Sequence, residues 1–73
     1  MIIKNNQRTS MVQGLKVKGL MAEINQNLSD LANILNIHRN TLSLKIRNKR
    51  PFTATEIKQI ADHYNVQVNI FFD

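Results

Sequence analysis

Apolar residues recur at helical spacing in two stretches of the first half of the chain. Positions i, i+3, i+4 and i+7 lie on one face of a helix, where their side chains can pack together. The first such face consists of Val17, Leu20, Met21 and Ile24, and the second of Leu28, Leu31, Ala32 and Leu35. The pattern predicts a helix near residues 14–25 and a second, short helix over 28–35. Asn27 is a preferred N-cap residue for the second helix, and Asn36 suits the left-handed residue that ends it.

A third helix is predicted directly after a short turn. Leu42 and Ile46 lie one helical turn apart and form its apolar side. Because a proline disfavours helical geometry in the residue before it, Pro51 limits this helix, which we expect to cover 39–47. Two short helices joined by so short a turn form a helix-turn-helix unit, here residues 28–47.

The fourth helix, predicted over 54–64, carries the clearest start signal in the chain. The Thr53 hydroxyl can accept a hydrogen bond from the amide of Glu56, whose side chain can reach back to the amide of Thr53, which is the pattern of a capping box. Phe52 and Ile57 stand at the positions of the accompanying hydrophobic staple. We therefore expect this helix to begin directly after Thr53.

Residues 66–72 fit more than one structure. Apolar and polar residues alternate up to Ile70, which favours a strand, whereas Phe71 and Phe72 suit one helical turn. Because the sequence offers no second strand for pairing, we expect a short terminal helix or a turn. Phe71 and Phe72 either both complete the core or leave one ring exposed in a contact between two copies of the chain.

The 73-residue chain has a net charge of +5, and its basic residues are clustered. Residues 1–18 contain four basic side chains and residues 39–50 contain five, with no acidic residue in either block. A clustered positive field attracts phosphate, so a polyanionic partner is expected. Residues 1–10 show little periodicity and are interpreted as a mobile basic arm, and residues 11–73 as the folded domain.

Several classes of protein are excluded by the composition. The chain has no cysteine, and neither histidine has a partner at metal-ligand spacing, so a disulfide framework and a metal site are not expected. The sequence contains no nucleophile–base–acid grouping and no glycine-rich phosphate loop, and a domain of this size is too small for a typical ligand pocket. We therefore expect no enzymatic activity, no cofactor and no small-molecule ligand. Without a signal peptide or a long apolar run, a cytoplasmic protein that binds no membrane is expected.

The outer side of the third helix carries side chains suited to reading DNA. Arginine can bind guanine, asparagine can bind adenine, and leucine can contact the methyl group of thymine. The candidate base-contacting residues are Arg39, Asn40, Ser43 and Leu44. Leu44 is alternatively an exposed apolar residue without a role, as is common on protein surfaces. Arg47, Lys49 and Arg50, at and beyond the end of the helix, are better placed for phosphates, which position a protein on DNA without reading its sequence.

A longer pattern runs from the second helix to the start of the fourth. It consists of Leu31-Ala32, Ile37, Arg39, Thr41-Leu42-Ser43, Lys45-Ile46, Pro51-Phe52-Thr53 and Glu56-Ile57. With this pattern, residues 15–72 resemble the lambda-repressor-like helix-turn-helix family of the Cro/CI or XRE type, especially small phage and prophage repressors. The resemblance implies a compact all-α domain of four to five helices that binds operator DNA as a symmetric dimer. It also implies that Arg39, Asn40, Ser43 and Leu44 face bases and that Asn48, Lys49 and Arg50 contact the DNA backbone.

The chain departs from the family pattern around its second helix. Many members begin this helix with a glutamine that contacts phosphate, but this chain has Leu28, and Asn27 or Gln26 is the expected replacement for that backbone contact. His38 replaces the serine that often precedes the third helix, and we expect it to cap this helix, with a phosphate contact as the alternative. Asparagine, which tolerates the left-handed conformation, replaces the glycines that commonly follow the second and third helices, at Asn36 and Asn48.

The sequence thus predicts a sequence-specific regulator of transcription that binds double-stranded DNA. The main hypothesis is a phage- or prophage-type repressor, homodimeric at least on a palindromic operator and associated with the nucleoid of a bacterial or phage-infected cell. One alternative is the DNA-binding antitoxin of a toxin–antitoxin pair, which needs an additional toxin-binding segment. Another is a protein-interaction adaptor on the same fold, which would present a face with few basic and amide groups.

Overall fold

The structure is a computed structural model that describes the backbone of residues 2–72 and the side chains of residues 13–72. This part of the chain is helical and contains no strand, which confirms the predicted all-α fold. The elements are α1 (Ile2–Glu23), α2 (Leu28–Leu35), α3 (Arg39–Ile46), α4 (Ala54–Tyr64) and the 3₁₀ helix η1 (Val68–Phe71). The short terminal helix η1 decides between the alternatives for residues 66–72. Over residues 2–72, no helix has the combination of length and hydropathy that crossing a bilayer requires.

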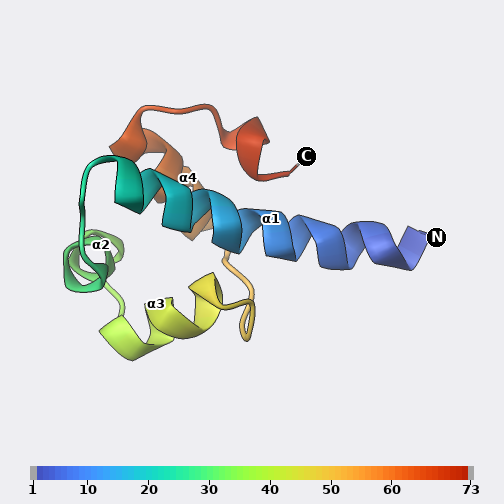
Figure 1. The fold of residues 1–73 in the computed structure, drawn as a ribbon, viewed down its shortest axis with the longest axis horizontal. Coiled ribbons are helices and arrows are strands. Elements are labelled where there is room, and N and C mark those ends of the chain that lie inside the picture. The colour runs from blue at the N-terminus through green and yellow to red at the C-terminus, as the bar shows by residue number, and fades with distance from the viewer. Residues whose placement is uncertain (1, 73) are drawn as a thin grey trace.

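Helix α1 runs through the middle of the arrangement (Figure 1). Helix α3 packs on one side of α1 and η1 on the other, while α2 packs against both α3 and α4. The N-terminal turns of α1 extend beyond the other helices (Figure 1). This arrangement leaves α3 at an edge of the molecule.

The start of α1 differs from the sequence-based prediction. The helix begins at Ile2, not near residue 14, so the backbone of residues 2–10 is helical where the sequence predicts a mobile arm. Residues 2–13 contain neither glycine nor proline, so nothing in them interrupts a helix. Apolar periodicity marks only those turns that pack on a core, and it therefore gave no sign of this extension. The division into an arm and a domain stays a prediction, and the side chains of Lys4 and Arg8 lie outside the described ones.

The core lies between the four α-helices and η1. Its buried apolar side chains are Val17, Met21, Leu31, Ala32, Leu35, Leu42, Phe52, Ile57, Ile60, Ala61 and Phe71. Ile24, which the periodic pattern assigns to the core, is instead 58% exposed, because α1 ends at Glu23 and the chain turns away. Phe71 is fully buried whereas Phe72 is 49% exposed, so only one of the two rings completes the core.

The four α-helices end in the same way. Each is followed by an asparagine in the left-handed conformation, with φ between 55° and 65°: Asn25, Asn36, Asn48 and Asn65. After α2, for example, the amides of Asn36 and Ile37 donate to the carbonyl oxygens of Asn33 and Ala32, at 3.1 and 3.0 Å. This is the Schellman motif, which satisfies the last carbonyl groups of a helix. The left-handed residues predicted at Asn36 and Asn48 are confirmed.

Candidate nucleic-acid interface

The turn before α3 aims the start of this helix outward. Asn36 ends α2, and His38 caps α3 by accepting a hydrogen bond at Nδ1 from the backbone amide of Asn40, at 3.1 Å. The predicted capping role of His38 is thereby confirmed. The cap satisfies an amide at the start of the helix. The side chains of Arg39 and Asn40, the first two residues of α3, are both exposed.

The four predicted base-contacting residues lie together on one side of α3. Arg39 and Asn40 are exposed, whereas Ser43 and Leu44, one turn further along, are half-buried. The opposite side of the helix is held by Leu42, which is fully buried in the core. The four predicted residues thus form one continuous outer face, and Leu44 is a partly covered member of it. Their contacts with DNA bases stay a prediction.

One member of the second basic block, Lys45, is not on the surface. Its ammonium group lies 2.5 and 2.6 Å from the two carboxylate oxygens of Glu56, and both residues are only 8% exposed. Glu56 compensates the charge of Lys45, so Lys45 adds little to the outer field. Both residues belong to the pattern that resembles the helix-turn-helix family, but sequence reasoning did not predict that their side chains pair. The exposed cations of the block are Arg39, Arg47, Lys49 and Arg50.

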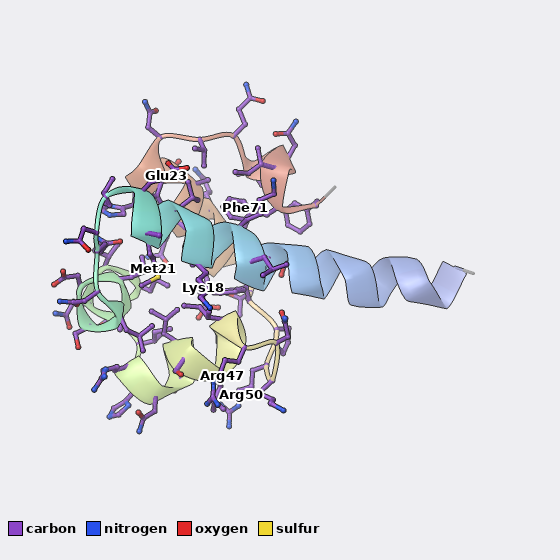
Figure 2. All side chains as sticks on the ribbon, in the orientation of Figure 1. Lys18, Met21, Glu23, Arg47, Arg50 and Phe71 are labelled. Atoms are coloured by element: carbon purple, nitrogen blue, oxygen red, sulfur yellow. The ribbon has the colours of Figure 1, made fainter. Side chains whose placement is uncertain are left out.

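The end of α3 presents the predicted contacts to the DNA backbone. Asn48 takes φ 65°, and its amide and that of Lys49 donate to the carbonyl oxygens of Lys45 and Leu44, at 3.1 and 2.8 Å. This motif turns the chain sharply, so that Lys49 and Arg50 are both exposed just beyond the helix. Figure 2 shows Arg47 and Arg50 at this same end of α3, on the side away from α1. The structure therefore brings four predicted backbone contacts together at the end of α3. We call this polar and basic set the basic group: Arg47, Asn48, Lys49 and Arg50.

Helix α1 supports this basic group from behind. Gln13 is 8% exposed and lines a hollow together with Asn48, Lys49 and Arg50. A Cβ atom on Gly14 would lie 2.4 Å from the carbonyl oxygen of Ile46, so only glycine allows α1 to approach the end of α3 this closely. The apolar pattern gave no sign of this contact, and the glycine within a predicted helix was its only signal.

Asn27, the remaining predicted backbone contact, belongs to a different element. It caps α2, and its Oδ1 accepts a hydrogen bond from the amide of Asp30 at 2.8 Å. A phosphate contact by Asn27 stays a prediction. Gln26 is engaged elsewhere, because its Oε1 accepts from the Tyr64 hydroxyl and its Nε2 lies 3.1 Å from Nε2 of His63. This favours Asn27 over Gln26 as the phosphate contact.

The chemistry of this surface is that of hydrogen bonding and positive charge. Among the described side chains, no three histidine, aspartate or glutamate residues gather as a metal site would require. His38 and His63 are each engaged in a hydrogen bond, with a helix start and with Gln26. The arrangement can bind a polyanion and read donors and acceptors along it.

Comparison with known proteins agrees with this geometry. Residues 16–69 match the family model of the Cro/C1-type HTH DNA-binding domain. The matched segment contains all of α2, α3 and α4, together with the basic group at the end of α3. No curated protein and no solved structure matches the chain. The family match covers well over half of the sequence, and the chain therefore belongs to the Cro/C1-type helix-turn-helix family of DNA-binding domains.

Proposed function

We propose that this chain is a transcriptional repressor of the phage or prophage type, which binds a palindromic operator as a homodimer with α3 in the major groove. One observation carries the proposal. The outer face of α3 and the loop after it carry four exposed cations, and no acidic residue occurs between Asp30 and Glu56. Since Glu56 is buried against Lys45, no carboxylate from this stretch opposes a phosphate backbone.

The proposal divides the surface into two groups with different tasks. Arg39, Asn40, Ser43 and Leu44 read base edges, because the outer face of a helix in the major groove is the part that reaches them. Five other residues hold phosphates and fix the register of α3: Asn27, Arg47, Asn48, Lys49 and Arg50. Losing a base contact should change sequence preference, whereas losing a phosphate contact should weaken binding to every sequence alike.

Selection of bound duplexes from a random pool tests the operator. A two-fold symmetric consensus, bound by two chains per duplex, is the expected result. Failure to enrich any sequence would overturn the proposal of a sequence-specific repressor. Enrichment of a single asymmetric site bound by one chain would instead contradict the proposed homodimer and the proposed palindromic operator.

Titration of two variants on the selected duplex tests the division of tasks. Arg39→Ala should lose about 1–3 kcal/mol of binding free energy on the selected site and relax the preference at one base pair. Lys49→Ala should weaken binding to all duplexes equally and lower the salt slope by about one. Lys58→Ala is the matched control, because Lys58 is an exposed lysine on α4 that pairs with Asp62. Equal losses for Arg39→Ala on selected and random duplexes would contradict base reading by Arg39.

A promoter reporter distinguishes repression from activation. With the selected site placed across a promoter, expression should fall as the protein is produced, because bound protein excludes the polymerase. Arg39→Ala should relieve this repression, while Lys58→Ala should leave it intact. Rising expression with the wild-type chain would make the protein an activator.

A further inference from the structure

The outer flank of α1 carries an apolar seam that no other part of the described chain covers. Leu15, Gly19 and Ala22 follow one another at spacings of four and three residues, and all three are exposed. Leu15 is 65% exposed, which is the largest value among the exposed large apolar side chains of the described residues. Spacings of three and four are those of the contact seam between two paired helices.

A hollow with charged edges accompanies this seam. Leu15, Gly19 and Leu20 line it together with Ile70 of η1, and Lys16 and Glu23 contribute its two charges. A Cβ atom on Gly19 would meet no heavy atom within 4 Å, so the fold of one chain gives no reason for glycine there. Glycine lowers helix stability relative to alanine, and without a side chain it leaves the middle of the seam open to close approach by another helix.

We propose that a second copy of this chain docks on the seam, with the two α1 helices antiparallel and a two-fold axis crossing them at Gly19. The inference rests on the homodimer of the proposed function and names the surface that forms it. A two-fold contact joins the same patch on both copies, so each residue meets one placed equally far beyond the axis. Leu15 lies four residues before Gly19 and Ala22 three after it, so Leu15 and Ala22 of the second copy come to within about 1.5 Å of the same level along the paired helices.

The charges of the two copies complement each other on the flank that carries Lys16 and Glu23, whereas the two Lys18 side chains face one another on the other flank. Lys16 and Glu23 line the same hollow, and flanking positions on the same side of a seam face one another in antiparallel helices. Lys16 of each copy therefore meets Glu23 of the other, which gives two ion pairs. Glu23 is the only acidic residue among the first 29, and it stands at the C-terminal end of α1, where the helix dipole disfavours a negative charge. A lysine from a second copy would compensate that unfavourable placement.

The arrangement also suits DNA binding. Helix α3 and η1 lie on opposite sides of α1 (Figure 1), and the exposed seam borders the hollow that α1 forms with Ile70 of η1. A two-fold rotation about an axis that runs from η1 toward α3 reverses the direction of α1. The same rotation leaves α3 on the same side of the dimer in both copies. Both α3 helices can then face one duplex. Because the seam spans only about two turns, we expect less than the ~1,200 Å² buried in stable interfaces, and thus a weak dimer that DNA reinforces.

Charge reversal tests the ion pairs by sedimentation. Lys16→Glu would place two carboxylates together at each contact, and Glu23→Lys would place two lysines together, so each single variant should associate at least about tenfold more weakly than wild type. The double variant K16E/E23K restores opposite charges and should return to within about threefold. The matched control exchanges the exposed Lys58–Asp62 pair of α4, as K58E, D62K and the double variant, and should leave association unchanged.

Two outcomes of this experiment would overturn the proposed surface. One is a double variant that associates no better than the single variants. The other is an equal response of the α4 set, which would show that net charge alone governs association. A wild-type chain that stays monomeric at millimolar concentration would also overturn it.

Introduced cysteines test the register, because the chain has no cysteine of its own. Mixing the Leu15→Cys and Ala22→Cys variants should give a disulfide-linked heterodimer. Leu15→Cys alone should not cross-link, since a rise of 1.5 Å per residue separates the two copies of position 15 by about 12 Å along the axis, beyond disulfide reach. Cross-linking of Leu15→Cys with itself would indicate parallel helices and contradict the proposal.

A duplex with one half-site separates this inference from the proposed function. The K16E/E23K variant keeps the net charge, and its binding to the half-site should equal that of wild type, because the seam lies away from the outer face of α3. Wild-type binding to the half-site without self-association would defeat only the docking surface. If the wild-type chain does not bind the half-site at all, the proposed function itself is contradicted.

Discussion

The ammonium group of Lys45 in α3 is held between the two carboxylate oxygens of Glu56, at 2.5 and 2.6 Å, at the start of α4. The same carboxylate accepts a hydrogen bond from the amide of Thr53, at 2.9 Å, and so completes the capping box of α4. Helix α3 packs mainly on α1 and α2, and this pair adds a link to the start of α4. One side chain therefore both begins α4 and fixes the inner side of α3.

Removing one member of this pair should destabilise the domain strongly. Lys45→Met leaves the buried carboxylate of Glu56 without its counter-ion, and the free energy of unfolding should fall by about 3 kcal/mol. Glu56→Gln keeps an acceptor for Lys45 and a capping-box side chain, so it should cost less. Urea unfolding of both single variants and of K45M/E56Q measures the coupling. A double variant that loses the sum of the single losses would show that the two residues act independently.

The two glycines of α1 have opposite environments. A Cβ atom on Gly14 would lie 2.4 Å from the Ile46 carbonyl oxygen, whereas one on Gly19 would meet nothing within 4 Å. Gly14→Ala should therefore destabilise the domain by about 1–3 kcal/mol through overpacking against the end of α3. Gly19→Ala should stabilise the monomer by about 1 kcal/mol through helix propensity. Thermal unfolding at low protein concentration checks both, and equal effects of the two substitutions would contradict this assignment.

Much of the fold follows from local sequence signals because those signals act within one or two helical turns. The capping box of Thr53 and Glu56 placed the start of α4 correctly, and the apolar spacing from Leu28 to Leu35 gave the bounds of α2. His38 was identified as a cap because it directly precedes the third helix. Each of these features depends on hydrogen bonds or packing between residues close in sequence, which a single sequence displays.

The features that escaped prediction depend on contacts between distant segments. Gly14 is explained only by the carbonyl group of Ile46, and the burial of Lys45 only by Glu56 in the next helix. The candidate site shows the same limit. The outward-facing residues of α3 could be identified from the sequence of this helix alone. That Lys45 is buried, and so does not belong to the exposed basic surface, follows only from the packing of α3 against its neighbours.

The left-handed asparagine that ends α2 can be tested against an asparagine inside the same helix. Asn36 has φ 57°, a conformation that costs most residues with a Cβ about 1–2 kcal/mol but that asparagine tolerates better. Asn36→Ala should therefore lower the free energy of unfolding by about 1 kcal/mol. Asn33 is exposed within the same helix, where alanine is the better helix former, so Asn33→Ala should raise stability by a few tenths of a kcal/mol. Chemical unfolding compares the two, and a loss at both positions would argue against backbone strain as the cause.

Tyr64 joins the end of α4 to the segment between α1 and α2. Its hydroxyl donates a hydrogen bond to Oε1 of Gln26, and desolvation by burial raises the pKa of Tyr64 above its usual value of 10.0. Tyr64→Phe removes the hydrogen bond and leaves the Gln26 oxygen with one partner fewer. Stability at neutral pH should therefore fall by about 1 kcal/mol.

The raised pKa of Tyr64 also predicts how this difference depends on pH. Below the unfolded-state pKa of 10.0 the phenol is protonated in both states, and its full contribution to stability is present. As the pH rises past that value, the unfolded chain loses the proton while the folded chain retains it, so unfolding becomes more favourable. The stability advantage of wild type over Tyr64→Phe should thus shrink above about pH 10. Lysines titrate in both proteins and cancel in the comparison. Because the chain has one tyrosine and no tryptophan, tyrosinate absorbance follows this group alone, and titration at or below the unfolded-state value would contradict the assignment.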